Sequence, residues 1–133
     1  MSNNQPTAEQ ITALAALPPD QPVIMVNLLQ FHADGGEQRY AQYGREVAPH
    51  LERVGARVIY GGSAPKQVIG EGLTPWWDAI LIAEYPTPQA FLAMVTTEEY
   101  QRVHEHRDAA LSRGELIATS TWGLDVPAIQ SQL

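Results

Sequence analysis

The sequence predicts an α+β domain, in which two helices pack on one face of a four-stranded antiparallel sheet. Three observations lead to this fold class. The expected elements follow the order strand, helix, strand, strand, helix, strand, which is two β-α-β units end to end. Two of the strands, Pro22 to Phe31 and Ala79 to Tyr85, are apolar at both odd and even positions, as strands buried on both faces are. The length of 133 residues suits a single domain.

A short helix is expected before the first strand. Thr7 and Gln10 have the spacing of a capping box, and two prolines after Leu17 end the helical pattern. The chain therefore divides into an N-terminal helical appendage (1–21), a main domain (22–125) and a C-terminal tail (126–133).

The first helix of the main domain is expected from Glu37 to Val54. Pro49 lies inside it and removes one hydrogen bond, so we expect a kink or break there. Arg57 to Tyr60 is the next expected strand. Gly61-Gly62 indicates a bulge or bend, and Gln67 to Ile69 indicates a continuation of the same ribbon.

The second helix of the main domain is expected in two segments. Thr87 follows the strand that ends at Tyr85 and is placed to accept a hydrogen bond as an N-cap. Thr96 with Glu99 has the spacing of a second capping box, so the helix should break and restart near Thr97.

The last elements complete a ferredoxin-like layout. Gly114 is expected to end the second helix, and Leu116 to Trp122 is expected to form the last strand. Helices on one face leave the other face of this sheet in water, although its central strands are apolar on both sides. Soluble monomers rarely expose such a patch. We therefore expect a homodimer, in which two sheets meet face to face and close a dimeric α/β barrel.

Composition and charge limit the partners. Eight basic residues against fifteen acidic give a net charge of -7, and the seven arginines are spread singly along the chain. Without a basic patch, we expect no nucleic-acid partner.

There are no cysteines, and no apolar run reaches the roughly 18 residues of a membrane span. We expect a cytoplasmic protein with no membrane partner. The four histidines lack the spacing of metal ligands, so we expect no metal site and no tightly bound cofactor.

The pattern resembles the dimeric α/β-barrel superfamily and, within it, the DUF1330 family of uncharacterised proteins. The matching stretches are MVNLLQF from Met25, YAQYGREVAPHLERVGARVIYGG from Tyr40, WDAILIAEYPTPQAFLAMV from Trp77 and EEYQRVHEHRDAAL from Glu98. The resemblance implies the dimeric barrel and a pocket between the sheet and the helices of one subunit. Superfamily relatives include cofactor-free monooxygenases, lactone isomerases, polyketide cyclases, hydroxynitrile lyases and haem-binding enzymes, so the fold does not define the reaction.

Asn27 is the only polar side chain between Met25 and Leu29. A buried amide needs partners, so Asn27 either bonds a neighbouring loop or points into a cavity. Tyr100, His104 and Arg107 share one face of the second helix and provide a phenol, a proton-transfer group and an anion clamp. The alternative is a solvated helix surface, with Arg107 paired to Glu84 or Asp78.

Our hypothesis is a cofactor-independent enzyme of the monooxygenase, isomerase, cyclase or lyase type that acts on a small organic molecule, with an anionic or aromatic compound as the expected class. A non-catalytic binding or accessory dimer is the alternative, and haem binding through a helix histidine is a third. The residues assigned to catalysis are Asn27, His104 and Asp78. Those assigned to ligand binding are Arg107, Tyr40, Tyr43, Trp76, Trp77 and Tyr100. The tyrosines also suit core aromatics. The two tryptophans alternate across a strand, so only one of them can face the pocket.

Overall fold

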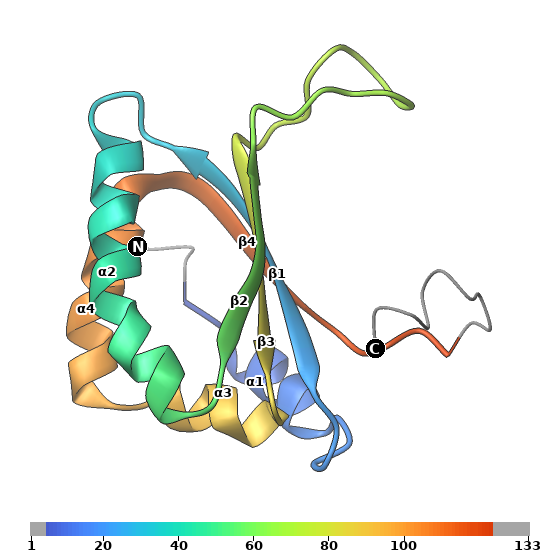
Figure 1. Cartoon of the computed structure of the whole chain (residues 1–133), viewed down its shortest axis with the longest axis vertical. Helices are drawn as coiled ribbons and strands as arrows, with labels where there is room; N and C mark the ends of the chain where they lie inside the picture. Colours follow the sequence, from blue (N-terminus) through green and yellow to red (C-terminus); the bar gives the residue numbers. More distant parts are fainter. Residues whose placement is uncertain (1–4, 124–133) are drawn as a thin grey trace.

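A computed structural model describes residues 5–123 of the chain. The elements in order are α1 (Ala8–Ala15), β1 (Val23–Phe31), α2 (Gly36–Arg53), β2 (Arg57–Ser63), β3 (Ala79–Tyr85), α3 (Pro88–Val95), α4 (Glu98–Ala110) and β4 (Leu111–Thr119). The strands form one antiparallel sheet in the order β2-β3-β1-β4. Helices α2 and α4 lie together on one face of this sheet (Figure 1). The predicted four-stranded sheet with helices on one face is therefore confirmed.

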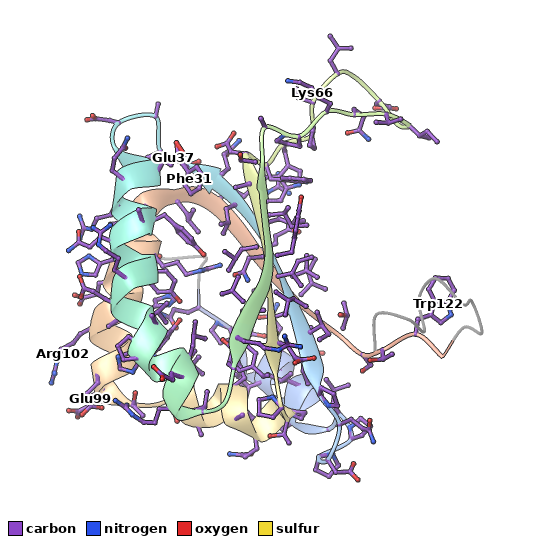
Figure 2. The ribbon with its side chains drawn as sticks, viewed as in Figure 1. Phe31, Glu37, Lys66, Glu99, Arg102 and Trp122 are labelled. Carbon is purple, nitrogen blue, oxygen red and sulfur yellow. The ribbon has the colours of Figure 1, made fainter. Side chains whose placement is uncertain are left out.

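The face of the sheet that meets the helices carries the core. Side chains of β1 alternate, and Val23, Met25, Asn27 and Leu29 are buried. Their neighbours on β3 share that face because directly paired residues of antiparallel strands point to the same side. Side chains of the helices and of the sheet extend into the space between them (Figure 2). One polar residue, Asn27, thus lies in an otherwise apolar row.

No helix covers the opposite face of the sheet within residues 5–123 (Figure 1). The pairing register places Ile24, Val26 and Leu28 of β1 there, with Ile80 and Ile82 of β3 beside them. Ile117 of β4 pairs with Val26 and is 44% exposed. The predicted second apolar face is therefore present, and it is bare in the single chain.

Helix α1 lies against α3 at one end of the sheet (Figure 1). The predicted capping box is confirmed, since the Thr7 side chain accepts from the Gln10 amide at 3.1 Å and Gln10 Oε1 accepts from the Thr7 amide at 2.9 Å. Leu14 and Leu17 pack on the edge of the core. No residue of α1 is fully buried, so this helix is held by a narrow contact.

Helix α2 runs without a break from Gly36 to Arg53. We expected a kink or break at Pro49, and the structure has no break there, although proline removes one backbone hydrogen bond. Gly35 precedes the helix with φ 78°, a conformation that favours glycine. Gly36 is required for another reason. A Cβ at this position would lie 2.5 Å from the carbonyl oxygen of Ala110, which already accepts from the His32 amide at 2.9 Å.

Two expectations about the β2–β3 connection are corrected. The ribbon does not continue at Gln67 to Ile69, which lie in a loop that projects from the sheet on the side away from α2 and α4 (Figures 1 and 2). Val68 and Ile69 are each 90% exposed and pair with no strand of the described residues. The irregularity of β2 falls between Val58 and Tyr60 rather than at the two glycines.

The second helix breaks and restarts as predicted, between α3 and α4. The N-cap of α4 is Thr97, whose side chain accepts from the Tyr100 amide, so the expected Thr96–Glu99 box is not the cap. Gly114 does not end the helix. Helix α4 ends at Ala110 and β4 begins at Leu111 with no residue between them. The last strand thus starts five residues earlier than predicted.

The tail expected at 126–133 lies outside the described residues. No helix within residues 5–123 is both long and apolar enough to cross a membrane.

Candidate functional site

A cavity of about 1080 Å³ lies between the sheet and the helices. Its walls come from all eight helices and strands of the described residues. Most of the lining is apolar, and the enclosed polar side chains come mainly from β1, α2 and α4. The predicted site residues that line the cavity are Asn27, Tyr40, Tyr43, Tyr100, His104 and Arg107.

Arg107 is the charged group of this cavity that is most enclosed. It is 6% exposed, and its Nη2 donates to Asn27 Oδ1 at 3.3 Å. Asn27 Nδ2 in turn donates to the carbonyl oxygen of Leu81 at 3.1 Å. Both the amide nitrogen and the amide oxygen of Asn27 are thus hydrogen-bonded within the protein, and Asn27 helps to position the guanidinium of Arg107.

A second chain of hydrogen bonds runs along α4. The Tyr43 and Tyr100 hydroxyls lie 3.0 Å apart, and the Tyr100 hydroxyl lies 3.3 Å from His104 Nδ1. Spacings of four and three residues along α4 put Tyr100, His104 and Arg107 on the face toward α2 and the sheet. His104 is 7% exposed. The predicted histidine, phenol and guanidinium therefore share one buried face.

Burial raises the pKa of Tyr43 well above the ordinary value for tyrosine, and the neighbouring Tyr100 adds to the rise. Burial also raises the pKa of Tyr100 and of Tyr40, which the Arg107 guanidinium lowers in part. Tyr40 thus lies near enough to Arg107 to interact with its charge. These phenols are thus neutral at physiological pH, and each remains a hydrogen-bond donor.

Within residues 5–123, none of the four ion pairs includes Arg107. Glu84 pairs instead with Arg57 at 3.0 Å. Asp78 is exposed and its Oδ2 accepts from the Phe31 amide at 2.9 Å. Both carboxylates that the sequence offered as structural partners of Arg107 are therefore engaged elsewhere.

Three predicted residues are not brought to the cavity. Asp78 caps the end of β1 through its bond to the Phe31 amide. The ring of Trp76 faces Arg113, whose guanidinium carbon lies 3.8 Å from the ring centroid. Trp77 is half-buried and, with the other two, is absent from the lining of the cavity. The strand starts at Ala79, so the strand alternation expected of the two tryptophans does not apply to them.

Sequence reasoning missed two parts of the lining. Tyr85, at the end of β3, is buried in the cavity wall, and burial raises its pKa. Tyr85 follows Leu81 and Ala83 at alternate positions of the strand. Because alternate residues share a face, this spacing could have predicted that Tyr85 faces the cavity. The apolar side of α1, with Ile11 and Leu14, also lines the cavity. Nothing in the sequence of α1 indicates where it packs.

Within residues 5–123, no group of three His, Asp or Glu side chains is placed to hold a metal ion. Exposed polar residues also line the cavity, namely Gln5, Gln10, Thr96, Gln101 and Glu115. Its enclosed polar groups are the Arg107 guanidinium, the His104 imidazole, the Asn27 amide and the phenols. Together they can hold an anionic group, donate hydrogen bonds to oxygen atoms and move a proton.

Comparisons with known proteins agree with this fold. The family described as domain of unknown function (DUF1330) matches residues 30–120. A protein of unknown function from Rhodopseudomonas palustris is 30% identical, with a TM-score of 0.78 over 93% of this chain and 100% of that chain. Hydroxynitrile lyase from Passiflora edulis has 6% identity and a TM-score of 0.63, over 80% of this chain and 98% of that chain.

A dimeric ferredoxin-like protein of unknown function from a Jannaschia species has 9% identity and a TM-score of 0.59, over 75% of this chain and 99% of that chain. No curated protein is significantly similar in sequence. The predicted ferredoxin-like fold and the family resemblance are both confirmed. With its family match over residues 30–120 and the fold shared with the Rhodopseudomonas protein, the chain belongs to the DUF1330 family.

Proposed function

We propose that this protein is a cofactor-independent enzyme that acts on a small organic acid, held in one pocket of each subunit of a homodimer. The observation that supports this most directly is Arg107, a buried cation on the cavity wall. Its hydrogen-bond partner Asn27 and its neighbour Tyr40 are both neutral. Burying a charge costs several kcal/mol unless it is compensated. A carboxylate ligand would compensate it and would suit the planar fork of the guanidinium.

His104 is the proposed proton-transfer group. An imidazole can accept or donate a proton at one ring nitrogen while the other is held, and the hydrogen bond of His104 Nδ1 with Tyr100 orients its ring. Neutral phenols nearby are donors for an oxygen atom that becomes negative when a substrate loses a proton. The group therefore fits a reaction that begins with removal of a proton from an organic acid. The same fold occurs in hydroxynitrile lyase from Passiflora edulis, which supports the capacity of the fold and not the substrate.

A non-catalytic binding dimer is the second candidate, and Asn27 favours it. Both functional groups of its side chain are already bonded, to Leu81 and to Arg107. The sequence analysis assigned Asn27 to catalysis. Because both of its side-chain groups are bonded to the protein, we propose that it positions Arg107. A pocket that only binds would need Arg107 and Asn27 but not His104.

The experiment that tests the ligand class is calorimetric titration with phenylacetate and with its neutral counterpart phenylacetamide. We expect the acid to bind more tightly than the amide, and Arg107→Met to lose that preference, by roughly tenfold or more. Asn27→Asp is the matched variant. It places a carboxylate beside Arg107, so the fold should be kept while the preference for the acid is lost. Equal binding of acid and amide by the native protein would refute the proposed anion site.

Catalysis is tested separately with phenylpyruvate, whose benzylic hydrogens are acidic. We expect the protein to accelerate exchange of these hydrogens for deuterium in D₂O, followed by NMR, and His104→Gln to abolish the acceleration while binding remains. Acceleration that survives in His104→Gln would remove the base assignment. Binding without any acceleration by the native protein would leave the binding dimer as the function.

The homodimer is proposed from the bare face of the sheet. Ile24, Val26, Leu28, Ile80 and Ile82 form a continuous apolar surface there. Since soluble monomers seldom expose such surfaces, a second sheet is the economical cover. The Jannaschia protein with this fold is dimeric, which supports the same arrangement here.

A further inference from the structure

We propose that the pocket takes an amphipathic acid with an extended apolar body, and that α1 is the wall that limits its length. The inference rests on the proposed anion site at Arg107. It adds the direction in which the ligand extends and the residues that select it.

The cavity has a polar end and an apolar end. Arg107 lies in the last turn of α4, beside Asn27 and Leu81. Tyr100 lies seven residues earlier on the same helix, about 10 Å away along its axis. On β3, Leu81 and Tyr85 lie about 13 Å apart by the rise of a strand. The cavity therefore continues well past any carboxylate bound at Arg107.

The far end of the cavity is mainly apolar and is completed by α1, with the exposed Gln10, Thr96 and Gln101 at its rim. Met25, Ala83 and Phe91 line it from the sheet and from α3, and Ile11 and Leu14 line it from α1. Helix α1 lies next to α3, and α3 directly precedes the first turn of α4 (Figure 1). It is thus at the opposite end of α4 from Arg107. A chain or ring system bound to Arg107 through its acid group would meet α1 last.

The loose packing of α1 agrees with this role. Its apolar residues Ile11 and Leu14 are half-buried, and no residue of the helix is fully buried. Apolar side chains that face a cavity lack packing partners on that side. An apolar ligand body would provide these partners, so ligands that reach α1 should gain affinity that shorter ones do not.

The test is a series of straight-chain acids, from butanoate through hexanoate, octanoate and decanoate to dodecanoate, titrated into the full chain. We expect affinity to rise by about fourfold for each added methylene and to stop rising at the length that reaches α1. Ile11→Trp should lower the affinity for decanoate at least about tenfold and leave butanoate unchanged. Leu14→Ala should move the limit to a longer acid.

Thr12→Trp is the control, because Thr12 is exposed and does not line the cavity. It should leave the whole series unchanged. If Ile11→Trp weakens all acids alike, or if affinity does not depend on length, α1 is not the end wall although the anion site stands. If no acid of any length binds to the native protein, the proposed function fails as well.

Discussion

At the scale of single residues, burial determines what the side chains of the cavity do. Tyr43 and Tyr100 are each less than a tenth exposed, and their hydroxyls bond one another. Burial raises both pKa values because the interior disfavours the phenolate. In the unfolded chain these tyrosines ionise near pH 10, whereas in the folded protein they keep their protons to higher pH. The folded state therefore loses stability as the pH rises above about 10.

Tyr43→Phe should reduce this loss. The stabilisation linked to Tyr43 is fully present below the unfolded pKa of about 10 and is lost as pH rises toward the folded pKa. Removing the group should lower the slope of unfolding free energy against pH by up to about 1.4 kcal/mol per pH unit above pH 10. Urea unfolding from pH 8 to about pH 11.5 measures that slope. An unchanged slope would show that Tyr43 ionises in the folded protein as easily as in the unfolded one.

The sequence predicted several residues of the cavity but not their connections. Asn27 stood out as a polar residue in an apolar strand, and Arg107 as an arginine on a partly apolar helix face. Their hydrogen bond joins positions 80 residues apart, and no local pattern records such a contact. The same limit explains why the sequence does not show that Asp78 and Trp76 lie outside the cavity. Their partners, the Phe31 amide and Arg113, come near only when the strands pair.

At the scale of elements, the junction of α3 and α4 shows how far capping patterns can be trusted. The sequence predicted the break, and the structure has it two residues after Val95. Two adjacent threonines competed for the cap. Thr97 accepts from the Tyr100 amide at 3.1 Å, whereas the Thr96 hydroxyl donates backward to the Leu92 carbonyl at 2.8 Å. Only the bond to Thr97 provides a partner for a backbone amide in the first turn of α4, which has no acceptor within the helix.

Thr97→Ala should therefore destabilise the protein by about 1 kcal/mol through loss of the N-cap. Thr96→Ala is the matched control and should have less than half of that effect, since its backward bond adds little to a helix. Guanidinium unfolding of both variants measures the difference. Equal losses would indicate that the predicted box at Thr96 contributes as much as the observed cap.

The start of β4 shows where local patterns fail. The stretch from Leu111 to Glu115 contains serine, arginine and glycine, which are poor indicators of a strand. It is a strand because β1 provides its ladder, with Leu29 opposite Gly114 and Phe31 opposite Leu111. Pairing with a distant partner thus overrides local preference.

At the scale of the whole molecule, the bare sheet face and the projecting β2–β3 loop lie on the same side, away from α2 and α4 (Figure 1). Val68, Ile69 and Leu73 in that loop are 84–90% exposed. The sequence anticipated the apolar face, because both parities of the central strands are apolar. The dimer that would cover it stays a prediction.

Val26→Arg tests the dimer. Val26 pairs with Ile82 on one side and Ile117 on the other, so it lies at the centre of the bare face. We expect the native protein to sediment as a dimer at micromolar concentration and Val26→Arg to sediment as a folded monomer, since a buried unpaired charge opposes association. Gln89→Arg adds the same charge at an exposed site of α3 and should leave the dimer intact. A native protein that sediments as a monomer would refute the proposed interface.

The direct passage from Ala110 into Leu111 has a practical consequence for anyone who wishes to label this protein. No residue separates α4 from β4, and Gly36 lies close to the Ala110 carbonyl. A peptide inserted there would therefore displace α4 relative to β4. The segment between Ser63 and Ala79 contains no helix or strand and projects from the sheet (Figure 1). A fluorescent reporter belongs there rather than beside the helix that carries the arginine.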